Sequence, residues 1–368
     1  MSSPNRKRVT KTGKGAFSLY LPKRWIDQWS KEQLKERRVD LQEVGDHLII
    51  SPIIKGSSQT GFLEHGDEDE IRQFLLCSYV QGYESAELRS EGFSDEQMSA
   101  ARNFVRLLDE RLILDVREES IGYGRDFKVN MDSPSVDQLQ RLLFEKLHES
   151  LRLSKELIAH LNGNRNRTIH LLHTLRTLEE EDIDRVAMQI MRRASRMEIT
   201  FHSFPDLFYT VLTTDLLEKL GDAIFGIAEG VCDLYGLDKG RLSFPMETIL
   251  EEMDVSSTLG LRNLQRTKEA YMREVEQLEE HLRRTMDIVL NRRGEAAYRY
   301  MEEIDGYHSR LKDRLAGLLA GSVSDSEGEP RNELVRIGYD LQQIASLTGD
   351  LVEEVAMFYF SDDLEDRT

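Results

Sequence analysis

A regular apolar periodicity from about Ser133 to Phe360 constrains this chain more than any other feature of its sequence. Apolar residues recur there every three or four positions, the spacing that places them on one face of an α-helix. Short breaks at NGNRN, TFHSF, YGLDKG and SVSDSEGEP divide the region into six helices. Long helices joined by short links pack antiparallel as bundles. The pattern therefore predicts a mainly α protein.

The six helices form two sets of three that resemble each other in sequence. EEDIDR at 180–185 corresponds to EEIDGY at 302–307, and DLLEKLGDAIFGIAE at 215–229 corresponds to DLQQIASLTGDLVEE at 340–354. The separations are close, 121 residues from Asp184 to Asp305 and 124 from Glu229 to Glu353. We therefore expect a duplicated three-helix unit, with a first repeat at 134–240 and a second at 245–362.

The first 54 residues follow a different pattern, with alternating apolar residues interrupted by glycines. Residues 6–53 predict a strand, a turn at Gly13 and Gly15, a second strand, a helix beginning near Pro22, and the closing strand HLIISPI. A unit this small leaves too much apolar surface in water to be stable alone. We expect it to dimerise.

Charge is distributed very unevenly along the chain. Residues 1–40 contain eleven Lys and Arg against four Asp and Glu, a balance of +7, so the rest of the chain carries −18 − 7 = −25. Basic residues concentrated on one small unit can neutralise DNA phosphates, which a net acidic protein would otherwise repel. The alternative is a solvated basic surface on an assembly module. The predicted DNA contacts are Arg6, Lys7, Arg8, Lys11, Lys14, Lys23 and Arg24.

A glycine-, serine- and acid-rich stretch at 55–70 has the composition of a linker. The next segment, 66–130, predicts a small α/β unit in the order helix, strand, helix, strand, and Ser94 with Gln97 forms a capping-box pattern at its second helix. It contains no phosphate-binding loop and no cluster of His or Cys. We interpret it as an interface or a spacer.

Two cysteines and the overall hydropathy bear on where the protein resides. Cys77 and Cys232 lie singly within apolar helical patterns, which predicts buried, reduced thiols. No stretch approaches the length of an uncharged membrane span, and the basic N-terminus lacks the apolar run of a secretory signal. We expect a cytoplasmic protein without membrane insertion.

Four carboxylates of the first repeat are candidates for a metal site. Glu218 and Asp222 are four residues apart and so share a helix face, and Glu180 and Asp184 have the same spacing. Four carboxylates facing each other across a bundle would repel strongly unless a cation or protons neutralised them. The alternative is that they are ordinary acids on solvated faces of an acidic protein.

The N-terminal residues RKRVTKTGKGAFSLYLPKRWID resemble the AbrB/SpoVT-type module. Lys11-Thr12-Gly13 and Leu21-Pro22-Lys23 fall in the order typical of that family. The resemblance covers Arg6 to about Ile53 and implies swapped β-hairpins that form a dimeric DNA-binding unit. One departure is the charged stretch SKEQLKERR, which lengthens the helix.

The helical region is similar to the PhoU family of phosphate-uptake regulators over about 134–360. Glu218-Lys219-Leu220-Gly221-Asp222 matches the glutamate-x-x-x-aspartate motif that binds metal in that family. The resemblance thus implies a divalent or iron-type metal ion in the first repeat, with Glu180, Asp184, Glu218 and Asp222 as ligands. In the second repeat we align the motif positions with Gln342 and Ser346, which would leave that repeat without a comparable site.

Taken together, the three parts match the domain order of archaeal-type PhoU-like regulators. This implies a regulator of phosphate uptake that binds promoter DNA, senses through its acidic body, and contacts the ATPase or a sensor component of a phosphate ABC transporter. The alternative is a cytoplasmic adaptor that restrains such a transporter, its N-terminal module serving only to dimerise it. We expect no enzyme, because a metal-dependent hydrolase would lack a nucleophile or histidine beside its acids.

Overall fold

The computed structural model describes most of the chain. It covers residues 10–11, 17–18, 39–44, 47–52, 58–62, 67–81, 83, 85–90, 92–108, 112–117, 120–125, 134–161, 165–196, 204–237, 265–323 and 332–359. The chain divides into two compact units, 1–57 and 58–368.

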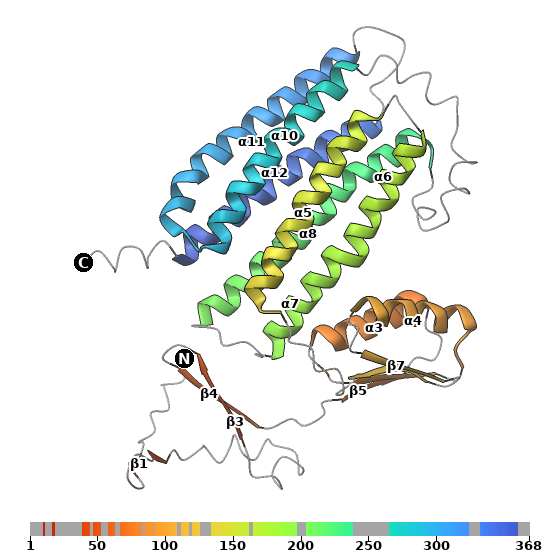
Figure 1. The fold of residues 1–368 in the computed structure, drawn as a ribbon, viewed down its shortest axis with the longest axis vertical. Coiled ribbons are helices and arrows are strands. Elements are labelled where there is room, and N and C mark those ends of the chain that lie inside the picture. Colours follow the sequence, from red (N-terminus) through yellow and green to blue (C-terminus); the bar gives the residue numbers. More distant parts are fainter. Residues whose placement is uncertain are drawn as a thin grey trace. The chain divides into compact units, whose positions relative to one another are not determined.

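The first unit contains two short antiparallel pairs of strands (Figure 1). β1 (Thr10–Lys11) pairs with β2 (Phe17–Ser18), and β3 (Val39–Val44) pairs with β4 (His47–Pro52). The strand predicted at HLIISPI is confirmed as β4. Its partner β3 was not predicted, because the charged VDLQEV sequence lacks a clear apolar alternation.

The second unit begins with a small mixed sheet. Its elements are β5 (Ser58–Phe62), α3 (Glu68–Val80), β6 (Ser85–Arg89), α4 (Asp95–Leu108), β7 (Leu112–Arg117) and β8 (Ser120–Arg125). The strand order is β5-β6-β8-β7; β5 runs parallel to β6, whereas the other neighbours are antiparallel. Both helices cover the same face of the sheet (Figure 1). The expected linker at 55–70 therefore contains a paired strand.

The helices of this α/β unit begin where their caps predict. At α4, the Ser94 N–H donates to Oε1 of Gln97 at 2.8 Å, and the Gln97 N–H donates to Oγ of Ser94 at 3.2 Å, which confirms the predicted capping box. Buried apolar residues of both helices and two strands form one core beneath them: Ile71, Leu75, Tyr79, Ala86, Leu88, Ala101, Val105, Leu108, Ile121 and Tyr123.

The helical body follows, and it confirms the prediction of a mainly α protein. Its first three helices are α5 (Val136–Ala159), a continuous helix made of α6 (Arg165–Thr177), the π-helical turn η1 (Leu178–Ile183) and α7 (Asp184–Arg196), and α8 (Phe204–Leu234). The next three are α10 (Gln265–Leu290), α11 (Gly294–Val323) and α12 (Asn332–Tyr359). In the part of the chain that is described, no helix is long and apolar enough to cross a membrane.

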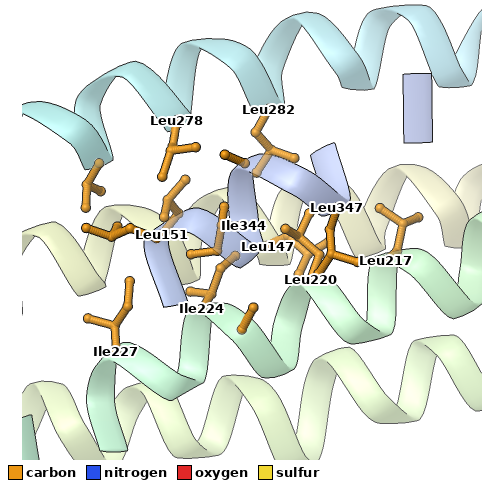
Figure 2. Close-up of a cluster of buried hydrophobic side chains, with 14 of the residues drawn as sticks. Leu147, Leu151, Leu217, Leu220, Ile224, Ile227, Leu278, Leu282, Ile344 and Leu347 are labelled. Carbon is orange, nitrogen blue, oxygen red and sulfur yellow. The ribbon is translucent and has the colours of Figure 1, made fainter. Parts of the chain in front are cut away.

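The two sets of helices share one hydrophobic core. Figure 2 shows its centre, where leucines and isoleucines from α5, α8, α10 and α12 meet. Full burial of one such side chain stabilises the fold by about 1.5–3 kcal/mol. The labelled residues are Leu147, Leu151, Leu217, Leu220, Ile224, Ile227, Leu278, Leu282, Ile344 and Leu347. The two repeats are therefore packed against each other along α8 and α12, and a rigid α8 is available to carry a site.

Polar contacts join the same two helices at the edge of this core. The Arg336 guanidinium of α12 pairs with Glu229 and, at 2.9 Å, with Asp233 of α8. Glu229, which the sequence places in the repeated motif, thus has a partner in the opposite repeat.

Two glycines mark equivalent positions in the two repeats. A Cβ at Gly221 of α8 would lie 2.9 Å from Cγ2 of Ile183, and a Cβ at Gly349 of α12 would lie 3.8 Å from Cγ2 of Ile304. Each glycine is followed by an aspartate, and so is each isoleucine. The contact is much tighter in the first repeat, where it presses α8 against the π-helical turn.

This difference predicts opposite outcomes for two matched substitutions. Gly221→Ala should lower the free energy of unfolding by about 1–3 kcal/mol, because the added methyl overpacks the contact with Ile183. Gly349→Ala should leave it unchanged or raise it by up to about 1 kcal/mol, because the site has room and alanine favours helix. Urea unfolding of both variants checks this; equal effects would contradict the tight packing at Gly221.

Candidate metal centre

The candidate site is built around the π-helical turn η1. Its hydrogen bonds span five residues, and the backbone N–H of Asp184 donates to the carbonyl oxygen of Glu179. Leu178 and Ile183 at its two ends are both buried. In an α-helix, residues five apart point about 140° away from each other. The wider π-helical turn lets the side chains of Leu178 and Ile183 both face the core. It also places Glu179, in place of Glu180, on the same face as Asp184.

Three carboxylates meet at this turn. Glu179, Asp184 and Asp222 each offer an oxygen, and these oxygens all lie within 4.8 Å of one another. Asp222 comes from α8, where the preceding Gly221 brings the two helices close together. Among the residues that the structure describes, this is the only group of three or more His, Cys, Asp or Glu side chains with such spacing.

Burial and mutual repulsion raise the pKa values of these acids. The pKa of Glu179 rises from 4.5 to about 8, mainly because the side chain is removed from water, with further contributions from the neighbouring carboxylates of Asp184, Glu180 and Asp222. Burial, followed by Glu218 and Asp222, raises the pKa of Asp184 from 3.8 to about 7. Burial also raises the pKa of Asp222. The site therefore favours a bound cation or protons over free carboxylates.

Glu218 lies beside this triad without being one of its three members. Burial raises the pKa of Glu218, followed by repulsion from Asp222 and Asp215. The ammonium of the neighbouring Lys219 pairs with Asp215 at 2.6 Å. Near the triad, the guanidinium of Arg176, which pairs with Glu180, opposes the rise in the pKa of Glu179.

The four acids predicted from the sequence are only partly brought together. Asp184 and Asp222 meet in the triad, and Glu218 is close enough to raise the pKa of Asp184. Glu180 is exposed and pairs with Arg176 at 2.7 Å. Glu179 takes the place in the triad because an i, i+5 turn, not the expected α-helix, precedes Asp184. The sequence contains one sign of this turn. Leu178 and Ile183 are five residues apart, whereas apolar residues on one face of an α-helix are three or four apart.

The second repeat also places acids at the corresponding junction, with a shifted alignment. The Gly349–Ile304 contact matches Gly221–Ile183, so Asp350 takes the place of Asp222 and Ser346 that of Glu218. The sequence alignment to Gln342 and Ser346 differs by one helical turn from the alignment that this contact gives, and residues four apart share a helix face. The pKa of Asp350 is raised by burial and by the nearby Glu353 and Asp305, while His308 opposes the rise.

The predicted DNA contacts fall on a part of the chain that is described only in part. Lys11 belongs to strand β1, whose backbone alone is described. The other predicted contacts, Arg6, Lys7, Arg8, Lys14, Lys23 and Arg24, lie outside the described residues. Their role in binding DNA stays a prediction.

The same helix that begins at Asp184 also holds the α/β unit. Arg192 of α7 donates to the carbonyl oxygens of Tyr79 at 2.7 Å and Tyr83 at 3.1 Å, and its guanidinium lies 4.4 Å from the centre of the Tyr79 ring. Ser195 donates to the carbonyl oxygen of Val80 at 2.5 Å. These bonds satisfy carbonyls at the C-terminal end of α3, which would otherwise lack helical partners.

Comparison with known proteins finds similarity at the level of structure. No protein-family model matches the chain, and no curated protein matches it either. Among solved structures, the chain is similar to the phosphate transport system regulatory protein PhoU from Streptococcus pneumoniae, with 14% sequence identity and a TM-score of 0.39. The match covers 61% of this chain and 94% of that one.

The raised pKa values predict how stability depends on pH in metal-free buffer. Because the pKa of Glu179 is higher in the folded chain than in the unfolded chain, folding takes up a proton between about pH 4.5 and 8. Its contribution to the free energy of unfolding is fully present below pH 4.5 and is lost as the pH rises through 8. Glu179→Gln should therefore flatten the loss of stability between about pH 5 and pH 8.5, measured by urea unfolding.

Glu302→Gln provides the control, because it neutralises an exposed acid on α11. This variant should keep the pH dependence of the wild type. A Glu179→Gln profile parallel to both would mean that Glu179 does not take up the proton.

Proposed function

We propose that this protein regulates phosphate uptake, with a metal-binding helical body and a DNA-binding N-terminal module. The observation that carries the proposal is the carboxylate triad, with Glu179 and Asp184 half-buried, at the junction of the second and third helices of the first set of three. The same junction contains the Glu218-to-Asp222 motif that resembles the PhoU family. The triad and the motif thus coincide at one place in the molecule.

The donor set of the triad fits a metal ion. Three carboxylate oxygens within 4.8 Å of one another offer the hard ligands that divalent cations and iron accept. Glu179, Asp184 and Asp222 would hold the ion, and Glu218 would lie next to it. A bound cation would add positive charge directly between the acids, and so lower their pKa values.

Helix α7 links the triad to the α/β unit, and this link fits a regulatory role better than a catalytic one. Asp184 is the first residue of α7, and further along that helix Arg192 and Ser195 hold the C-terminal end of α3. Binding at the triad can therefore act on the packing between the helical body and the α/β unit. We infer that this connection transmits the state of the site, with a phosphate ABC transporter component or the DNA-binding module as the recipient.

The charge distribution supports DNA as the partner of the N-terminal module. The first 40 residues carry +7 and the remainder −25, so phosphate groups are attracted by one end of the chain and repelled by the rest. The strand pairs β1–β2 and β3–β4 are compatible with the swapped hairpins implied by the AbrB/SpoVT resemblance.

Binding of full-length protein to phosphate-regulated promoter fragments tests the proposal. Replacing Arg6, Lys7 and Arg8 together with glutamine should weaken binding and reduce the slope of log K against log salt by about 0.9 for each DNA phosphate that is no longer neutralised. Fluorescence anisotropy at several salt concentrations measures both quantities. Lys312→Gln, which removes an exposed positive charge from α11, should change neither.

No binding by the wild-type protein at low salt would contradict the DNA-binding part of the proposal. The N-terminal module would then serve dimerisation, as in an adaptor that acts on a transporter directly.

A further inference from the structure

A cavity of about 430 Å³ lies beside the triad, between helix α3 of the α/β unit and helices α7 and α8 of the body. Its size is that of a small-molecule site, because such pockets usually span about 300–1,000 Å³. The chemistry of its walls differs sharply from one end to the other.

Most of the cavity wall is apolar and adaptable. Leu76 and Val80 line it from α3, and Ala187, Met188 and Met191 line it from α7. Methionine side chains are unbranched and polarizable, so they pack against ligands of varied shape. An aliphatic or aromatic body of modest size fits such a wall better than a fully polar molecule.

The opposite end of the cavity is acidic. Asp184 lines it from α7, and Asp215 and Glu218 line it from α8. Asp215 is paired with Lys219 at 2.6 Å, so the carboxylates of Asp184 and Glu218 are the acids at this end that a ligand would meet. None of the described residues that line the cavity is Lys, Arg or His. The field at this end therefore attracts a cation and repels an anion.

We propose that this cavity binds a small organic cation, a protonated amine with an apolar body, whose ammonium group lies against Asp184 and Glu218. The apolar body would pack on Met188, Met191 and the α3 residues. This site adjoins the metal triad and shares Asp184 with it, whereas Glu179 and Asp222 are not among the residues that line the cavity.

The two walls of the cavity are held together by specific bonds. Arg192 and Ser195 of α7 bind the carbonyl oxygens of Tyr79 and Val80 at the end of α3. Arg192 is itself 6% exposed. An occupant would therefore contact both sides of the junction between the α/β unit and the body, and its binding would stabilise that junction.

A cysteine provides a natural probe of this cavity. Cys77 lines it from α3 and is exposed, whereas Cys232 is fully buried. The prediction of two buried thiols is therefore wrong for Cys77, because the buried face of α3 is formed by Ile71, Leu75 and Tyr79. Alkylation of folded protein by iodoacetamide should occur at Cys77 and report on whether the cavity is occupied.

The test compares three probes of equal chain length in buffer with EDTA: hexylammonium, hexanoate and 1-hexanol. At roughly four times its dissociation constant, hexylammonium should slow the alkylation of Cys77 about fivefold, because only unoccupied chains react. Hexanoate should give no protection at the same concentration, and 1-hexanol should need a much higher one. Equal protection by hexanol and hexylammonium, or none by any probe, would overturn the proposal.

Two matched variants test the acidic end of the cavity. Glu218→Gln should raise the hexylammonium concentration for half-protection about tenfold, the loss expected for one charge contact. Glu302→Gln should leave it unchanged, since this exposed acid of α11 does not line the cavity. Circular dichroism shows whether each variant is folded. A Glu218→Gln variant that is folded and protected like the wild type would overturn the proposal, whatever the triad does with metal.

Discussion

The structure depends on like charges that are held together at one turn of helix. Glu179, Asp184 and Asp222 lie close enough for their charges to repel, and burial adds to the cost, as their raised pKa values show. The hydrophobic core holds them there, because Leu178 and Ile183 are buried on either side of the turn and Gly221 lets α8 approach. Packing of the core thus offsets the repulsion among the three carboxylates. A bound cation would reduce that repulsion.

Much of the fold could be predicted from the sequence, because the core of the body is formed by residues that recur every three or four positions. The six helices follow from this spacing, and their grouping into two sets of three follows from the sequence similarity between the sets. Strand β5 could not be found in the same way, since its SQTGF sequence pairs with β6, which is distant along the chain. Pairing between distant segments leaves little trace in local composition.

The site was harder to predict, for two physical reasons. A π-helical turn changes which acid shares a face with Asp184, so an α-helical spacing selects Glu180 where the structure has Glu179. Positions one helical turn apart share a helix face, so spacing alone could not distinguish Ser346 from Asp350 as the counterpart of Asp222. The alignment used here comes from Ile183 and Ile304, each of which lies against a glycine of a neighbouring helix. Such a contact between helices cannot be read from local spacing.

Manganese binding by Glu179→Gln and Glu180→Gln tests the central claim most directly, because these neighbouring glutamates have the same side chain and only Glu179 belongs to the triad. Titration of each full-length variant with Mn²⁺, followed by electron paramagnetic resonance of the free ion, measures the affinity. We expect Glu179→Gln to bind manganese at least about tenfold more weakly than the wild type. Glu180→Gln should bind like the wild type. Loss of binding in Glu180→Gln, with Glu179→Gln unaffected, would contradict the account.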